Sequence, residues 1–186
     1  MTILCLGWGS LIWCNKALPL KSEWSKDGPA LRVEFARQSK DKRITLVICG
    51  EDVPPVTTFW AMLDVANVED AKCALADREG VLKKNISRDI GYWTPEGKSP
   101  GPAASEVARW AEGRNIDGIV WTALGPKIRG VYQMPSVHEV IDHLRSLQGV
   151  ECEAAKEYVR LAPKQIATQY RRQIEDSLGW TPTGLF

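Results

Sequence analysis

Strand patterns fill the first part of this chain and helix patterns fill its end, and that order limits the folds open to it. Residues 3–6, 31–37, 43–49 and 57–65 form short apolar runs or alternate apolar with polar residues, as strands do. From residue 136 onward, apolar residues recur with the 3.6-residue period of helices. Segregated strands and helices predict an α+β fold: a mixed sheet that curls toward a barrel, with helices packed on it.

The pattern also predicts how some of these elements pair and where they end. Residues 31–37 and 43–49 flank a polar turn and should form a hairpin, and 57–65 is apolar on both faces, which favours a central strand. Asn67 is a suitable N-cap for a helix that Gly80 ends. Further helices are expected at 105–114, from Ser136, at 152–161 and from Pro163 to Leu178, and a buried strand at 117–124.

Length and composition are those of an ordinary globular domain. The 186 residues suit a single domain over 1–186, with a core over 1–130 and a helical extension over 131–186. The 24 basic and 23 acidic residues give no field that favours nucleic acid or a membrane surface. No apolar run reaches transmembrane length, the apolar start lacks a basic region, and the five cysteines form no C-x-x-C pair, so we expect a cytoplasmic protein.

The first candidate site is the segment Gly7-Trp8-Gly9-Ser10-Leu11, which directly follows the first predicted strand. Two glycines permit positive φ and close approach of a ligand, and successive N–H groups in such a turn can converge on an anion. The segment lacks the third glycine of a dinucleotide fingerprint and the Lys-Ser/Thr ending of a phosphate loop. A turn without any binding role is the alternative.

The second candidate is Glu79, at the end of the helix that starts after Asn67. A carboxylate there meets the negative end of the helix dipole, which raises its pKa and makes it a better base. A solvated surface glutamate is the simpler alternative. Arg78 and Arg37 could help to bind a substrate carboxylate, or could form ordinary surface ion pairs.

Together the two motifs resemble those of the γ-glutamylcyclotransferase fold family over about residues 1–95. Family members carry a Tyr-Gly-Ser-Asn/Leu-Leu loop after the first strand, which Gly9-Ser10-Leu11 matches. Phe59-Trp60-Ala61-Met62-Leu63 resembles the strand that reads Val-Trp-Gly-Val-Val-Trp-like in the family, and Glu79-Gly80-Val81 matches the motif that holds the catalytic glutamate. The sequence departs from the family at Trp8, which replaces the loop tyrosine and cannot supply its hydroxyl.

The resemblance implies a γ-glutamylcyclotransferase-like barrel and release of 5-oxoproline from a γ-glutamyl amine or peptide. Glu79 would be the general acid/base, and Gly7, Trp8, Gly9, Ser10 and Leu11 would bind the substrate. No metal or organic cofactor is implied, the partner is a small γ-glutamyl molecule, and the oligomeric state and leaving amine stay open. Trp8 and the loop 94–102 are candidate walls that would exclude water.

Two other functions are compatible with the same residues. The fold could hold a small anionic ligand without turnover, or water could replace the internal amine and give amide hydrolysis or acyl transfer. Other chemistry has little support: His138 and His143 do not share a helix face and are expected at the surface, and Cys14 has only Lys16 as a basic neighbour. Arg171, Arg172, Glu175 and Asp176 are expected to form a salt-bridged helix surface.

Overall fold

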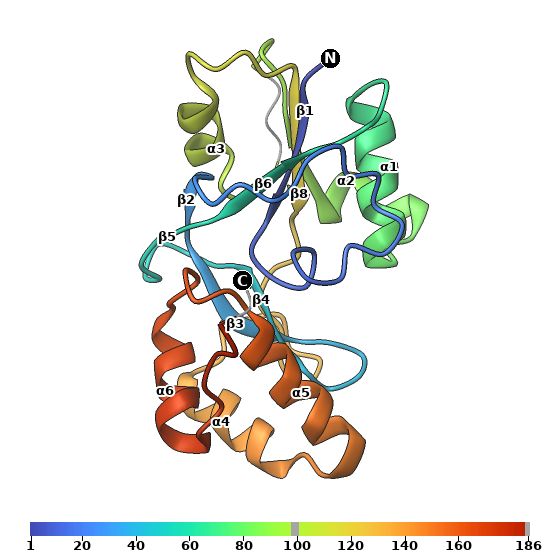
Figure 1. Cartoon of the computed structure of the whole chain (residues 1–186). Helices are drawn as coiled ribbons and strands as arrows, with labels where there is room; N and C mark the ends of the chain where they lie inside the picture. Colours follow the sequence, from blue (N-terminus) through green and yellow to red (C-terminus); the bar gives the residue numbers. More distant parts are fainter. Residues whose placement is uncertain (98–100, 185–186) are drawn as a thin grey trace. The chain divides into compact units, whose positions relative to one another are not determined.

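The computed structural model describes residues 1–97 and 101–184 (Figure 1). The chain divides into two compact units, and each is assembled from separate segments. The first unit consists of Met1–Gly7, Cys14–Leu31 and Thr57–Leu124, and the second of Trp8–Trp13, Arg32–Val56 and Gly125–Phe186. The single domain predicted over residues 1–186 stays a prediction.

The first unit is built on a four-stranded mixed sheet with the order β6-β1-β8-β7. Its strands are β1 (Ile3–Gly7), β6 (Phe59–Met62), β7 (Ile90–Trp93) and β8 (Gly118–Thr122). β1 pairs in parallel with β8 and antiparallel with β6, and β7 pairs antiparallel with β8. The two central strands are almost entirely apolar and buried, as strands covered on both faces must be.

The predicted strand over 57–65 is not central, and it is interrupted. The structure has β5 (Val56–Thr57), which pairs with β2 (Ala30–Leu31), and then β6 at the edge of the four-stranded sheet. The backbone of Ser25 exchanges hydrogen bonds with Trp60 on the outer side of β6, and Leu20 forms a bridge to Leu63. The segment that contains Leu20 and Ser25 therefore covers the outer edge of β6, which explains why an edge strand has an apolar sequence.

Helix α1 (Val68–Glu79) packs against β8, β7 and β1 within the first unit (Figure 1). The predicted ends are confirmed: the side chain of Asn67 accepts from the backbone N–H of Asp70, and Gly80 ends the helix with a left-handed φ of 68°. The chain continues through the 3-10 turn η1 (Lys83–Asn85) and the short helix α2 (Ile86–Asp89) into β7, and α3 (Ala104–Ala111) lies against β7.

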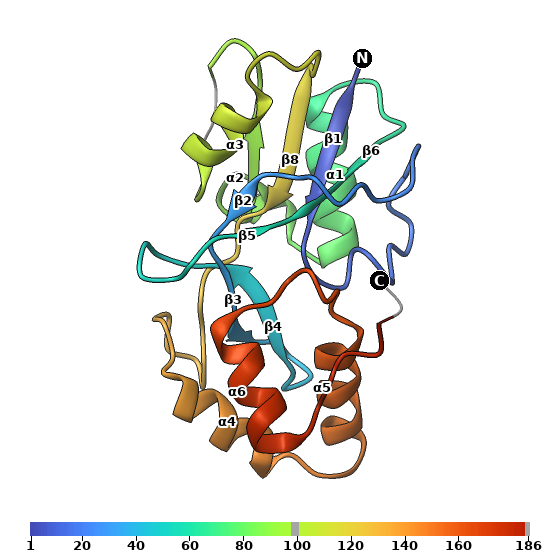
Figure 2. The same ribbon diagram turned by 60° about the vertical axis from the view of Figure 1, so that its left-hand side comes forward.

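The second unit pairs a β-hairpin with three helices (Figure 2). The predicted hairpin is confirmed as β3 (Val33–Gln38) and β4 (Ile44–Ile48), with a register shift between Phe35 and Arg37. The helices are α4 (Val137–Ser146), α5 (Gly149–Leu161) and α6 (Gln169–Leu178). α6 packs on β3, α5 on β4 and α4 on α6, and the predicted start of a helix at Ser136 is confirmed by a capping box between Ser136 and Glu139.

Helix α6 begins at Gln169, not at Pro163 as the sequence pattern predicts, because Thr168 is its N-cap and accepts a hydrogen bond from the backbone N–H of Arg171. Glu34 of β3 is almost completely inaccessible to solvent. It accepts hydrogen bonds from the Thr168 hydroxyl and, at 3.0 Å, from the backbone N–H of Tyr170. Burial raises the pKa of Glu34 above its usual value, and these donors to the carboxylate act in the opposite direction. The carboxylate therefore joins β3 to the first turn of α6.

Arg171 of α6 is also buried, with 2% of its surface exposed, and is not part of the predicted salt-bridged surface. Its guanidinium pairs with Glu175 and also satisfies carbonyl groups at the end of α5 and in the connection that follows. The four carbonyl acceptors belong to Val159, Ala162, Pro163 and Ile166. One side chain thus replaces a helix C-cap and fixes the turn between α5 and α6.

The α+β class, the mixed sheet and the helical C-terminal part are confirmed. The predicted closed barrel is not: the described strands form one sheet of four strands and two sheets of two strands. Within residues 1–97 and 101–184, every helix is too short or too polar to pass through a lipid bilayer.

Candidate functional site

The predicted substrate loop starts where β1 ends. Gly7 is the last residue of β1 and belongs to the first unit, whereas Trp8, Gly9, Ser10 and Leu11 belong to the second. Gly7 has no room for a side chain, because a Cβ there would lie 2.7 Å from the Trp24 ring. The loop closes as a turn in which the N–H of Ile12 donates to the Gly9 carbonyl at 3.0 Å.

Trp8 holds this loop against β4 in the second unit. Its ring is buried, and its indole N–H donates to the carbonyl of Leu46 at 3.2 Å. The N–H of the same residue, Leu46, donates to the hydroxyl of Tyr158 on α5, also at 3.2 Å. The loop and α5 therefore satisfy the outer edge of β4, so Trp8 has a structural role whatever it contributes to a ligand.

Tyr158 is a neighbour of the candidate loop that the sequence did not reveal. Its side chain is buried, packs edge-on against Trp13 and Phe35, and brings its hydroxyl against Gly9. A Cβ built on Gly9 would lie 2.6 Å from this hydroxyl oxygen. The family's loop tyrosine is absent here, but a tyrosine hydroxyl from a distant helix lies against the same turn.

Gly9→Ala is accordingly expected to destabilise the second unit by about 1–3 kcal/mol, since the added methyl overpacks a closed contact. Urea unfolding followed by tryptophan fluorescence would measure it. The matched control is Gly50→Ala, because a Cβ there meets nothing within 4 Å. Combining Gly9→Ala with Tyr158→Phe should recover part of the loss; equal unfolding free energies for wild type and Gly9→Ala would contradict the close contact.

Glu79 is the last residue of α1 and is largely shielded from solvent, with 20% of its side chain exposed. Its Oε1 lies 2.9 Å from Nη1 of Arg78, whose own side chain is only 6% exposed. The surface-glutamate alternative therefore does not describe this residue. The Arg78–Glu79 pair is enclosed, and such pairs respond strongly to changes in either partner.

The pKa of the Glu79 carboxyl is raised above its ordinary value, chiefly because burial disfavours the charged form. Arg78 and Lys16 act in the opposite direction because their positive charges stabilise the carboxylate. The raised pKa is as predicted from the sequence, but its main cause is burial and not the helix dipole. A carboxylate with a raised pKa accepts a proton more readily than an ordinary glutamate does.

Two segments next to the substrate loop in the sequence contribute to the surroundings of Glu79. Cys5 of β1 lies two residues before Gly7, and Glu79 raises the pKa of its thiol together with burial. Cys14 directly follows Trp13, and its carbonyl accepts a hydrogen bond of 2.5 Å from Nη2 of Arg78. Within the first unit, the carboxylate is thus linked to the residues on both sides of the loop.

The remaining candidates have structural partners or lie apart. Arg37 donates to the carbonyl of Gly125 at 2.7 Å. His143 is buried, contrary to the surface position predicted for it, and its Nε2 lies 2.7 Å from the carbonyl oxygen of Lys42. His138 is exposed, as predicted.

Of the predicted cover loop 94–102, residues 98–100 lie outside the described residues. No group of three or more His, Cys, Asp or Glu side chains in the described chain is arranged to hold a metal ion.

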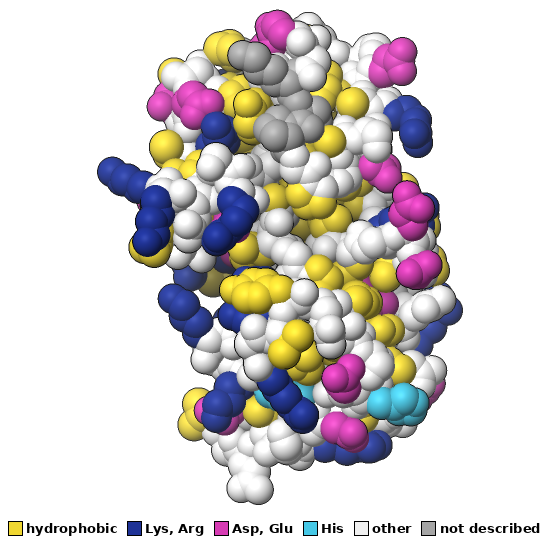
Figure 3. All heavy atoms as spheres, turned by 180° about the vertical axis from the view of Figure 1, so that it is seen from behind, with side chains coloured by type: hydrophobic (Ala, Val, Ile, Leu, Met, Phe, Trp, Pro, Cys, Tyr) yellow, Lys and Arg dark blue, Asp and Glu magenta, His cyan; other side chains and the backbone are white. Residues whose placement is uncertain are grey.

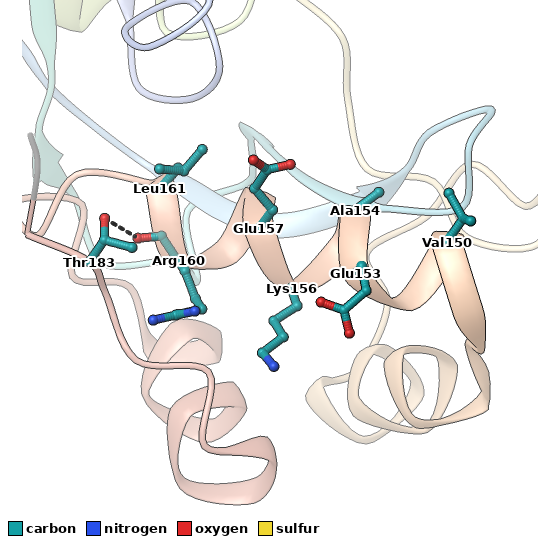
Figure 4. A pocket seen from close by; sticks show the side chains of 8 residues that line it. All are labelled: Val150, Glu153, Ala154, Lys156, Glu157, Arg160, Leu161 and Thr183. Carbon is teal, nitrogen blue, oxygen red and sulfur yellow. Dashed lines mark hydrogen bonds between the residues drawn. The ribbon is translucent and has the colours of Figure 1, made fainter.

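The second unit also has an open hollow along α5, with a volume of about 540 Å³ (Figure 4). It is lined by Val150, Glu153, Ala154, Lys156, Glu157, Arg160, Leu161 and Thr183. Thr183 hydrogen-bonds to the carbonyl of Arg160, which attaches the C-terminal segment to the helix. None of the predicted site residues lines this hollow, and most of its side chains are exposed, unlike those of an enclosed ligand pocket.

Basic and acidic side chains both occur on the face shown in Figure 3, as expected for a nearly balanced charge.

No protein-family model matches the chain, and no curated protein matches it either. The function must therefore be argued from the site residues.

Proposed function

We propose that this protein is a γ-glutamylcyclotransferase-like enzyme that releases 5-oxoproline from a γ-glutamyl amine or peptide. The observation that carries the proposal is the shielded carboxylate of Glu79, whose pKa is raised and whose helix packs against the strand that leads into the glycine loop. The order of the two motifs over residues 1–95 supports the same fold family. An unused surface glutamate would need neither burial nor an enclosed arginine.

In the proposed reaction, the ionised Glu79 takes a proton from the substrate's α-ammonium group. The freed amine nitrogen attacks the γ-carbonyl carbon, which forms the C–N bond of the five-membered lactam. Protonated Glu79 gives its proton to the leaving nitrogen, and the bond from the carbon to that nitrogen breaks. The ring nitrogen then loses its second proton to Glu79, which passes it to the departing amine. The products are 5-oxoproline and a free amine, and the carboxylate is regenerated.

Residues Gly7 to Leu11 are proposed to bind the γ-glutamyl group. Backbone N–H groups of the loop would hold the α-carboxylate, and charge-assisted hydrogen bonds of this kind contribute roughly 1.5–3 kcal/mol each. Holding the flexible arm in its folded form can lower the barrier of ring closure by as much as about 7–11 kcal/mol. The rigid attachment of Trp8 to β4 suits this role, because a loop that positions a substrate must itself be fixed.

The test is a panel of γ-glutamyl substrates: glutathione, γ-glutamyl amino acids and a γ-glutamyl polyamine, with products separated by mass spectrometry. Release of 5-oxoproline with an equal amount of free amine supports the proposal. Glutamate in place of 5-oxoproline would indicate hydrolysis. Saturable binding of these compounds without any product would indicate a binding module, and either result would contradict the proposed reaction.

A further inference from the structure

Two hydrogen bonds of the Arg78 guanidinium lead in different directions. Nη1 pairs with the Glu79 carboxylate at 2.9 Å, and Nη2 donates to the carbonyl of Cys14 at 2.5 Å. We infer that Arg78 is a positioning residue, which fixes the carboxylate of Glu79 relative to the chain that follows the substrate loop. This inference rests on the proposed function, because it assigns Arg78 to the same proton transfer.

The Arg78–Glu79 pair is not an ordinary helix-surface pair. Side chains at i and i+1 point to different sides of a helix, and stabilising pairs usually lie three or four residues apart. This pair forms at the end of α1, where Gly80 leaves the helix with positive φ, and where the Cys14 carbonyl gives the guanidinium a second acceptor. The burial of both side chains indicates that the arrangement is fixed.

The other ionisable groups around α1 act on Glu79 without a direct contact or pair with other residues. Lys16 and the Cys5 thiol interact electrostatically with Glu79. Against the rest of α1, β8 contributes no ionisable side chain, and Arg88 and Asp89 of α2 pair with each other. The Tyr92 ring of β7 lies under the ammonium group of Lys72. Arg78 is therefore the positively charged group in direct contact with the proposed catalytic carboxylate.

Arginine has a chemical reason to occupy this position. Its planar group offers several N–H donors in fixed directions, so it can hold a carboxylate and a carbonyl at once. Lysine retains the charge but is a single point of attachment, and methionine retains the approximate length without charge. The two substitutions therefore separate the geometric role of Arg78 from its electrostatic role.

The experiment compares Arg78→Lys and Arg78→Met with wild type, using kcat, KM and the pH profile of kcat/KM for the substrate that the panel identifies. Arg88→Met is the matched control, because Arg88 also pairs with the next residue but is 71% exposed. The pKa of the Glu79 carboxyl is measured separately by carbon-13 NMR, which does not depend on activity. Thermal unfolding shows whether each variant is folded.

We expect Arg78→Lys to lower kcat by roughly 10- to 100-fold with little change in KM, since a misplaced group slows the reaction by about this much. Arg78→Met should do the same and also move the acidic limb of the profile and the Glu79 titration upward by about 1 pH unit or more. The control Arg88→Met should change neither kcat nor the Glu79 titration.

Wild-type kcat in Arg78→Lys, or an unmoved Glu79 titration in Arg78→Met, would overturn the inference. A wild type inactive on the whole panel would instead contradict the proposed function, and the titration would still decide whether Arg78 controls Glu79.

Discussion

Glu79→Gln is expected to reduce the release of 5-oxoproline by about 10²- to 10⁴-fold, because the amide cannot carry the proton from the α-ammonium to the leaving nitrogen. The loss should fall on kcat, since the loop that is proposed to bind the γ-glutamyl group is unchanged. Single-turnover assays with purified protein would measure it. Asp77→Asn is the control: it removes a carboxylate from the same helical turn, but an exposed one, and should retain full activity.

The same variant should change how stability depends on pH. Because the pKa of Glu79 is raised in the folded protein, the folded state binds this proton more tightly than the unfolded chain does. Its contribution to stability is therefore greatest at low pH and declines as pH rises from the ordinary glutamate value through the raised one. Glu79→Gln should remove that part of the decline when the melting temperature is followed between about pH 4 and 8. A Glu79→Gln protein that keeps full activity would exclude Glu79 as the proton carrier, and one that keeps the whole decline would contradict the raised pKa.

Arg171→Met is expected to lower the free energy of unfolding by about 3–5 kcal/mol, the range measured when one partner of a buried charged pair is removed. The substitution would leave carbonyl groups around the end of α5 without donors and would release Glu175. A fall in the melting temperature of roughly 10 °C would correspond to this loss in a chain of this size. Circular dichroism during thermal and urea unfolding would measure it.

The neighbouring Arg172 provides the control for this prediction. It is exposed on the same helix, so Arg172→Met removes the same charge and adds the same side chain with an expected change within about 0.5 kcal/mol. Similar unfolding free energies for the two variants would show that the buried hydrogen bonds of Arg171 contribute little to stability.

Local signals in the sequence were sufficient for many of the elements. β1, the β3–β4 hairpin, β8 and the helices α1 and α4 follow from apolar periodicity, and their ends follow from Asn67, Gly80 and Ser136. These features depend on residues a few positions apart, so a linear pattern contains them. The loop at Gly9 and the glutamate at the end of α1 were identified in the same way.

Contacts between distant residues could be read only from the tertiary structure. Glu34 of β3 binds the start of α6 across more than a hundred residues, and Tyr158 of α5 reaches the turn at Gly9. The Arg78 contact with Cys14 and the buried position of Arg171 likewise have no counterpart in local periodicity. A sequence gives the preference of each residue for a helix, a strand or the interior, but the partner of a buried charge is chosen by how the elements pack, because burial is stable only where that partner is present.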